Sequence, residues 1–129
     1  MIAVDSSALV AVIFGEPELT RFSAIIAREP AVISAASVTE TAMVVEGRQG
    51  ADALQELRLT LQRGGIDVVP VDAEAAWTAH AAWQRFGKGR HPAGLNFGDC
   101  FAYALAKNLS VPLLYKGDDF SQTDITAAI

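Results

Sequence analysis

The sequence predicts an α/β protein built on a central, mainly parallel sheet of four or five strands. Short apolar runs of strand length alternate with longer segments whose apolar residues recur at helical spacing. This alternation calls for right-handed crossovers, with helices covering both faces of the sheet. The chain has 129 residues, 51% hydrophobic and 19% charged, so we expect one domain, 1–129, with its own core.

The first half of the chain predicts two strands, each followed by two helices. The strands are 2–4 and 31–34, and the helices are 8–14, 17–29, 37–50 and 52–63. The first helix follows Asp5 and two serines, which are favoured cap residues, and Gly15 ends it. Ser37 and Glu40 have the spacing of a capping box, which indicates the start of the third helix.

The second half predicts two more strands and two helices. The strands are 66–69 and 111–115, and the helices are 73–86 and 96–108. Asp72 caps the helix that begins at residue 73. Three glycines and a proline make 87–95 a loop. Trp77 and Trp83 lie on an alanine-rich helix, where we expect them in the core or in an interface.

The composition excludes several classes of protein. Cys100 is the only cysteine and cannot form an internal disulfide, so a reducing compartment is the default. No basic region precedes an apolar run at the N-terminus, as a signal peptide requires. The longest apolar stretch, 8–14, is far below the roughly 20 residues of a membrane span. We therefore expect a cytoplasmic protein without a membrane partner.

Acidic residues stand at the ends of several predicted elements. Asp5 directly follows the first strand, and Asp118 and Asp119 follow the last. Glu40 and Asp99 each fall in the first turn of a predicted helix. Ligands bind beyond the carboxyl ends of parallel strands, so we expect these acids to converge there. Each acid alone is also explained as a helix cap, a first-turn residue or a turn residue.

Clustered carboxylates repel one another, and a divalent cation removes that cost. Oxygen ligands without a Cys or His cluster suit Mg²⁺ or Mn²⁺ rather than zinc. Such an ion activates water and stabilises charge on a phosphate.

Four segments together resemble PIN-domain ribonucleases, in particular VapC-type toxins of type II (VapBC) toxin–antitoxin modules. They are Met1–Leu9, Ser37–Ala42, Leu95–Ala106 and Pro112–Phe120. The resemblance implies a three-layer αβα sandwich and a Mg²⁺- or Mn²⁺-dependent endoribonuclease that forms no covalent enzyme intermediate. Asp5, Glu40 and Asp99 match the family's acids. Asp118 is our first choice for the fourth, with Asp119 as the alternative.

Other side chains are expected to support this site. Asn96 lies one helical turn before Asp99 and can orient a carboxylate or a water. Ser6 or Ser7 can hydrogen-bond Asp5 or the substrate. The candidates for phosphate contacts are Lys88, Arg90, His91 and Lys116, although 86–94 is equally explained as a solvated basic loop.

The resemblance also implies protein partners. These are a second copy of the chain and a cognate VapB-type antitoxin, whose C-terminal segment inhibits the toxin in a hetero-oligomer. In such modules the antitoxin reads DNA, so no direct DNA reading is expected of this chain. Two alternatives remain. One is a small Mg²⁺-dependent phosphohydrolase, which the serine at position 7 disfavours, and the other is a non-catalytic PIN-like binding domain.

The net charge of −5 argues at first against an RNA partner, since phosphate contacts need Lys and Arg. Setting aside four site acids leaves eleven acids against ten cations. The acidity then describes a local metal pocket on a nearly neutral surface, and RNA is no longer excluded.

Overall fold

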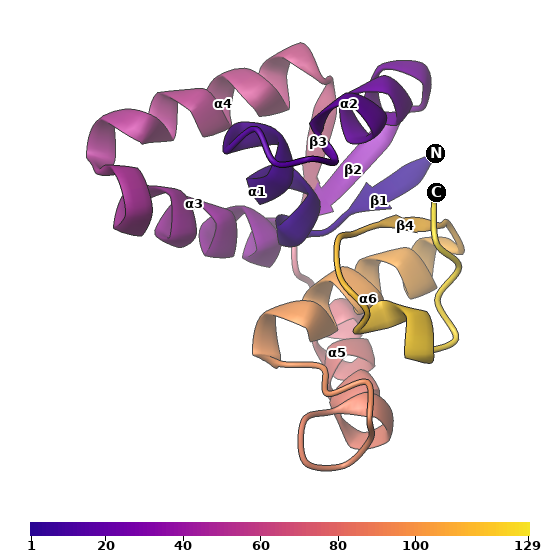
Figure 1. Ribbon diagram of the computed structural model, residues 1–129. Coiled ribbons are helices and arrows are strands. Elements are labelled where there is room, and N and C mark those ends of the chain that lie inside the picture. The colour runs from indigo at the N-terminus through magenta and orange to yellow at the C-terminus, as the bar shows by residue number, and fades with distance from the viewer.

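A four-stranded, fully parallel sheet forms the centre of the molecule in the computed structural model, which describes residues 1–129 (Figure 1). Its strands are β1 (Ile2–Val4), β2 (Ala31–Ser34), β3 (Ile66–Val69) and β4 (Leu113–Leu114). The spatial order is β3-β2-β1-β4. The helices are α1 (Ser6–Ile13), α2 (Leu19–Arg28), α3 (Ala35–Gln49), α4 (Leu54–Arg63), α5 (Ala73–Phe86) and α6 (Phe97–Leu109), with short 3₁₀ turns at Ala51–Ala53 and Phe120–Gln122. The sequence therefore predicts the fold class correctly.

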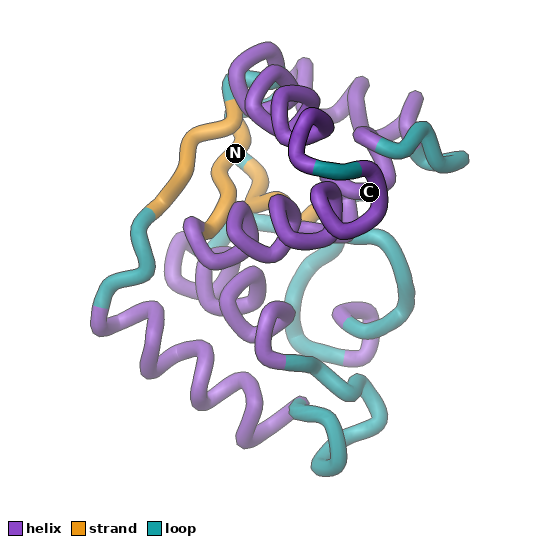
Figure 2. The backbone as a smooth tube through the Cα atoms, turned by 90° about the vertical axis from the view of Figure 1, so that its left-hand side faces the viewer, coloured by secondary structure: helices purple, strands orange, loops and turns teal.

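The order of the strands fixes the layers. The chain steps from β1 to β2 to β3 in one direction, and then returns to place β4 on the other side of β1. Because each crossover is right-handed, this reversal sends its helices to the opposite face. Accordingly α1 to α4 lie on one side of the sheet and α5 and α6 on the other (Figures 1 and 2). The point of reversal lies between β1 and β4, where open α/β sheets bind ligands.

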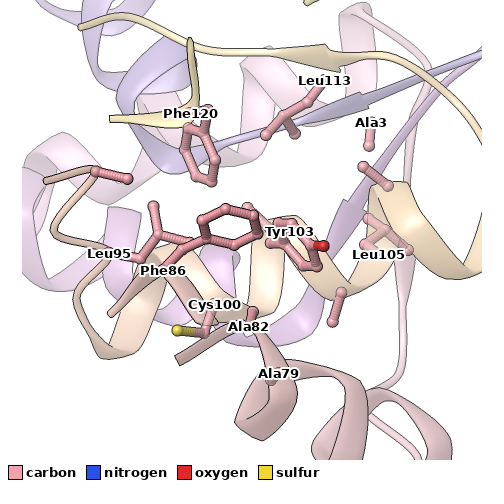
Figure 3. Close-up of a cluster of buried hydrophobic side chains, with 14 of the residues drawn as sticks. Ala3, Ala79, Ala82, Phe86, Leu95, Cys100, Tyr103, Leu105, Leu113 and Phe120 are labelled. Carbon is pink, nitrogen blue, oxygen red and sulfur yellow. The ribbon is translucent and has the colours of Figure 1, made fainter. Parts of the chain in front are cut away.

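Alternating side chains of the strands supply two cores, one on each face. Ala3, Val32 and Leu113 pack with α5 and α6 (Figure 3). Ile2, Val4 and Ile33 face the other way and pack with α1, α2 and α4. This period of two is what a strand buried on both faces requires.

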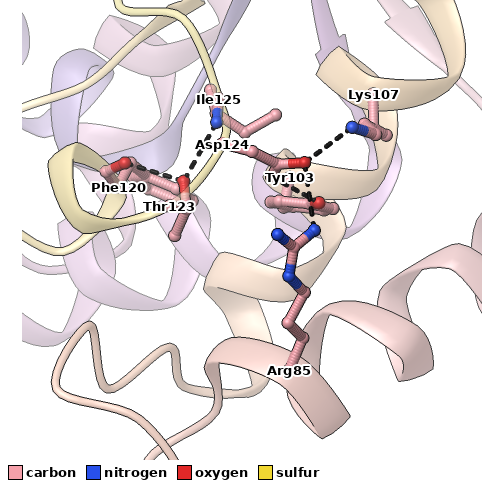
Figure 4. A network of polar contacts seen from close by, with 7 residues as sticks. All are labelled: Arg85, Tyr103, Lys107, Phe120, Thr123, Asp124 and Ile125. Carbon is pink, nitrogen blue, oxygen red and sulfur yellow. Dashed lines mark hydrogen bonds and ion pairs between the residues drawn. The ribbon is translucent and has the colours of Figure 1, made fainter.

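The C-terminal segment extends the sheet edge beside β4. The Leu113 amide donates to the Thr126 carbonyl, and the Ala128 amide donates to the Leu113 carbonyl, both at 2.9 Å. Asp124 ties this segment to the helices, because it accepts from Tyr103 and Lys107 at 2.7 Å and from Arg85 at 3.3 Å (Figure 4). The strand predicted at 111–115 shortens to Leu113–Leu114. Its later start follows from Pro112, which has no amide to donate.

Five of the six helices begin one or two residues away from their predicted starts, and the differences at α1 and α3 bear on the site. α1 begins at Ser6, two residues early, because Asp5 itself is the N-cap. α3 begins at Ala35 with Ser34 as its N-cap, so the predicted capping box of Ser37 and Glu40 is wrong. Ser37 is instead fully buried, and Glu40 lies in the second turn rather than the first. No helix combines the length and apolarity that crossing a membrane would need.

Candidate active site

Asp5 lies at the point between β1 and β4 where the strand order reverses. It is the residue after β1, its amide donates to the Leu114 carbonyl at 2.9 Å, and it is only 2% exposed. One carboxylate oxygen, Oδ2, accepts from the Ser7 amide at 3.0 Å and from the Ser7 hydroxyl at 2.6 Å. The other oxygen, Oδ1, is buried without a hydrogen-bond partner. A buried carboxylate oxygen without a partner needs a proton or a cation.

Glu40 joins three helices at this point. It projects from α3, and its Oε1 accepts from the Ser6 hydroxyl on α1 at 2.6 Å. Its carboxylate also packs against Gly98 in the first turn of α6. A β-carbon at position 98 would overlap all three atoms of the Glu40 carboxylate. Gly98 therefore provides the space that Glu40 occupies.

Asp99 is held by the start of α6. Its Oδ2 accepts from the Asn96 amide at 3.0 Å, while Asn96 Oδ1 accepts from the Asp99 amide at 2.9 Å. This reciprocal pair is a capping box in which Asp99 fills the third helical position. The cap fixes one carboxylate oxygen and leaves the other for the site.

The carboxylates affect one another's ionisation. Burial raises the pKa of Asp5 from 3.8 to about 6; the Ser7 hydrogen bonds oppose this, and the Glu40 charge adds to it. Burial also raises the pKa of Asp99 from 3.8 to about 7. The hydrogen bond from Asn96 opposes that rise, and the charges of Asp5, Asp119 and Glu40 reinforce it. Three predicted acids and Asp119 therefore share one electrostatic environment.

Asp118 and Asp119, the adjacent acids after β4, act on different neighbouring groups. The charge of Asp119 raises the pKa of Asp99. The charge of Asp118 acts instead on Tyr115, the pKa of which is raised mainly by burial. Both residues lie on the segment that leaves the sheet beside Asp5. Of the two, Asp119 is the one coupled to the cluster.

The donor chemistry fits a hard divalent cation. No three Asp, Glu, His or Cys side chains converge closely enough to form a ready-made cage. Mg²⁺ does not require one, because it is usually held by one or two carboxylates and keeps several waters. Such an ion would bind the Asp5 Oδ1, which has no hydrogen-bond partner. It would also relieve the repulsion between Asp5 and Asp99 that contributes to the raised pKa of Asp99.

Cys100 does not provide a nucleophile. It is 4% exposed and lies on the buried face of α6, within the hydrophobic core. Burial raises its pKa to about 11, and the Asp99 charge contributes. Because the thiolate is the reactive form, this thiol is unreactive near neutral pH.

The predicted phosphate contacts are dispersed. Lys88, Arg90 and His91 lie on the loop between α5 and α6 and make no hydrogen bond or ion pair with the acids. The Arg90 guanidinium lies 4.2 Å from the centre of the Trp83 ring. His91 Nδ1 accepts from the Ala93 amide at 3.0 Å. Lys116 is nearer the cluster, but its ammonium pairs with Glu16 and Glu18 at 3.3 and 3.2 Å.

Sequence reasoning left Ser6 and Ser7 open as partners of Asp5, and it missed both Gly98 and the carboxylate partners of Lys116. Ser7, rather than Ser6, is the partner of Asp5, and the spacing alone left these serines equivalent. Gly98 had a usable signal, because glycine in the first turn of an otherwise alanine-rich helix is unfavourable without a packing reason. No signal in the sequence indicated the partners of Lys116, since Glu16 and Glu18 are distant from it along the chain.

The fold and site define an α/β domain with carboxylates gathered at the carboxyl ends of parallel strands. Residues 2–125 match the family model described as PIN domain. The chain is 50% identical to Ribonuclease VapC30 of Mycobacterium tuberculosis H37Rv over 123 residues, 95% of this chain and 94% of that protein. It is 48% identical to Ribonuclease VapC of Mycolicibacterium smegmatis over 125 residues, 96% and 97% of the two chains.

Solved structures agree on the fold. The crystal structure of Mycobacterium tuberculosis VapC20, described as a sarcin-ricin loop cleaving toxin, superposes with a TM-score of 0.78 at 21% identity over 98% of this chain and 97% of that chain. VapBC2 of Rickettsia felis, bound to a DNA fragment from its promoter, gives 0.77 at 13% identity over 98% and 96%. The chain belongs to the PIN-domain family and, within it, to the VapC ribonucleases.

Proposed function

We propose that this protein is the toxin of a type II toxin–antitoxin module and a divalent-metal-dependent endoribonuclease, using Mg²⁺ or Mn²⁺. The observation that carries the proposal is the unpartnered Oδ1 of buried Asp5 beside Glu40 and Asp99. Membership of the VapC ribonucleases supports RNA as the substrate. The single, buried cysteine agrees with a reducing, cytoplasmic location.

Each acid has a distinct role in the proposal. Asp5 and Asp99 would bind the cation directly, and Glu40 and a fourth acid would complete the shell or hold waters. Asp119 replaces Asp118 as our choice for the fourth acid, because its charge acts on Asp99. When bound, the cation would supply an activated water and neutralise charge on the scissile phosphate.

The surrounding residues hold these carboxylates in place. The Ser7 hydroxyl and amide donate to Asp5, and the Ser6 hydroxyl donates to Glu40. The Asn96 amide donates to Asp99. We further propose that Lys88, Arg90 and His91 contact RNA phosphates along the loop between α5 and α6, which carries three cationic-capable side chains within four residues.

Two protein partners belong to the proposal. A cognate VapB-type antitoxin inhibits the toxin in a hetero-oligomer, as the membership of the VapC family suggests. A homodimer is supported by exposed apolar side chains on α3, α5 and α6, since Met43 is 69%, Trp77 73% and Phe97 81% exposed. Sedimentation of the purified chain tests the dimer, and a mass near 13.7 kDa would contradict it.

Cleavage of structured RNA by the antitoxin-free protein, with and without Mg²⁺ or Mn²⁺, tests the activity. Asp5→Asn and Asp99→Asn should each lower metal-dependent cleavage by at least about a hundredfold, because each removes a cation ligand. Asp67→Asn, which changes an exposed carboxylate on β3, is the matched control and should cleave normally. Equal cleavage by all variants would contradict the site. No cleavage by the intact protein would favour a small-molecule phosphohydrolase or a non-catalytic binding domain.

A further inference from the structure

We propose that Lys116 is a positioning residue, which fixes Asp5 through its backbone amide and the acid-bearing 115–119 segment through its ammonium group. This inference rests on the proposed nuclease function for its kinetic consequences. It assigns Lys116 a role other than contacting RNA. The contacts that carry it join residues far apart in the sequence.

The backbone of Lys116 forms a directed hydrogen-bond chain to Asp5. Its amide donates to the Ser7 hydroxyl at 3.0 Å, and this hydroxyl lies 2.6 Å from Asp5 Oδ2. A hydroxyl has one proton, and a carboxylate can only accept. Because Ser7 Oγ accepts from Lys116, its proton is directed to Asp5. The chain occupies Oδ2 and leaves Oδ1 as the oxygen without a partner.

The side chain of Lys116 points to a different part of the molecule. Its ammonium lies 3.3 Å from Glu16 Oε1 and 3.2 Å from Glu18 Oε1, in the turn between α1 and α2. The hydrogen bond with Glu18, followed by the contacts with Glu16, raises the pKa of Lys116 although burial opposes it. The ammonium is therefore held charged between two carboxylates, and because these three groups together carry a net charge of −1, they do not attract a phosphate.

Gly117, the residue after Lys116, shows why the attachment of Lys116 matters for the acids that follow. Gly117 has φ of 102°, in the region that favours glycine, so the backbone there is intrinsically permissive. Asp119 follows two residues later. Lys116 is thus anchored directly before the glycine turn, and it connects the start of α1, the α1–α2 turn and the segment that carries Asp119.

The positioning role and a phosphate contact predict opposite results for Glu16→Gln/Glu18→Gln. If Lys116 positions the acids, this double variant should lower kcat for RNA cleavage about tenfold or more, as loss of an outer-shell partner usually does, with KM unchanged. Lys116→Met should lower kcat similarly. The triple variant should be no worse than either, because all three residues act in one unit. If Lys116 contacts RNA, freeing it should lower KM instead.

Lys107→Met is the matched control, because it removes another lysine that pairs with a carboxylate, in this case Asp124, which makes no contact with the acids of the site. It should leave kcat and KM unchanged. Lys116→Met with raised KM and normal kcat, or a fully active Glu16→Gln/Glu18→Gln variant, would overturn the proposal.

Amide hydrogen exchange separates failure of this inference from failure of the proposed function, since it needs neither RNA nor metal. Exchange at the Lys116 amide should accelerate in Ser7→Ala, which removes its acceptor, and in Glu16→Gln/Glu18→Gln. Unchanged exchange in both variants would overturn the positioning role even in an active nuclease. Accelerated exchange in a chain that cleaves no RNA would support the attachment and contradict only the nuclease assignment.

Discussion

At the scale of single residues, Asp5 combines a structural cost with a functional role. Its pKa rises from 3.8 to about 6 in the folded protein, so folding favours the neutral carboxyl. Between these values the folded state binds more protons than the unfolded chain, and the free energy of unfolding therefore falls as pH rises. Above the upper value, ionised Asp5 costs the folded protein about 3 kcal/mol at most.

Asp5→Asn removes this cost. Without metal, we expect urea to unfold the variant at a higher concentration than the wild-type protein near neutral pH, by up to about 3 kcal/mol, with little difference near pH 4. Adding Mg²⁺ or Mn²⁺ should reduce the gain, because only the wild-type protein is stabilised by binding the ion. Asp67→Asn should show no such gain. A variant less stable than wild type at both pH values would contradict the expected cost of burying the ionised Asp5 carboxylate.

Gly98 tests how closely Glu40 must approach α6. Gly98→Ala places a methyl group where the Glu40 carboxylate lies, so Glu40 must leave Ser6 and the cluster. We expect about a tenfold or larger loss of RNA cleavage, as for other disrupted outer-shell contacts. Helix propensity alone favours alanine over glycine by about 1 kcal/mol, so a weaker helix cannot explain the loss.

Gly47→Ala on α3 is the control for Gly98→Ala. Nothing lies within 4 Å of a β-carbon at that position. It should raise stability by about 0.5–1 kcal/mol and leave cleavage unchanged. Full activity of Gly98→Ala would show that Glu40 can function elsewhere.

At the scale of elements, what the sequence predicts depends on how local the signals are. The bounds of α5 are predicted correctly, because its N-cap Asp72 and its final Gly87 are adjacent to it in sequence. The start of α3 is predicted two residues too late, because Ser34 both ends β2 and caps the helix with no intervening turn. Glu40 had a plausible local partner in Ser37. Its actual partner, Ser6, comes from another helix.

The capping box of α6 is the element-scale feature that serves the site. Asn96→Ala removes the side chain that accepts from the Asp99 amide, which should cost about 1 kcal/mol of stability. It should also lower RNA cleavage, because the Asp99 amide loses its acceptor and the first turn of α6, which carries Asp99, is held less firmly, although the Asn96 amide can still donate to the Asp99 carboxylate. Asp72→Ala is the matched control, since Asp72 caps α5 by accepting from the Ala75 amide at 2.8 Å.

The two cap variants should lose similar stability in urea unfolding, but only Asn96→Ala should lose activity. Equal activity of the two would show that the cap supports α6 without orienting Asp99. A proportionate loss of activity in Asp72→Ala would attribute both effects to general destabilisation.

At the scale of the whole molecule, strand order decides where the site forms. Alternation of strands and helices predicts a parallel sheet, and acids after the first and last strands predict a site where those strands are neighbours. The order β3-β2-β1-β4 confirms that neighbourhood. Local spacing could not choose between Asp118 and Asp119, nor link Lys116 to Ser7, 109 residues away. Such contacts depend on the complete fold.

Charge is also organised at this scale, and it limits how RNA can bind. Several cations are already engaged: Lys116 by two glutamates, and Arg85 and Lys107 by Asp124. Lys88 and Arg90 are exposed and make no ion pair with a carboxylate, although Arg90 packs on Trp83. The loop between α5 and α6 is therefore the proposed source of phosphate contacts.

Lys88→Ala/Arg90→Ala should weaken RNA binding and raise KM while leaving kcat nearly unchanged, because these residues touch no acid of the site. Measured on cleavage-deficient Asp5→Asn, the dependence of log Kd on log salt should become shallower by about 1–2, since each lost phosphate contact on a single strand removes about 0.7. Arg58→Ala/Arg63→Ala on α4 removes the same charge elsewhere and should leave the slope unchanged. An equal change in both double variants would mean that RNA responds only to net charge, and that this loop has no special place in binding.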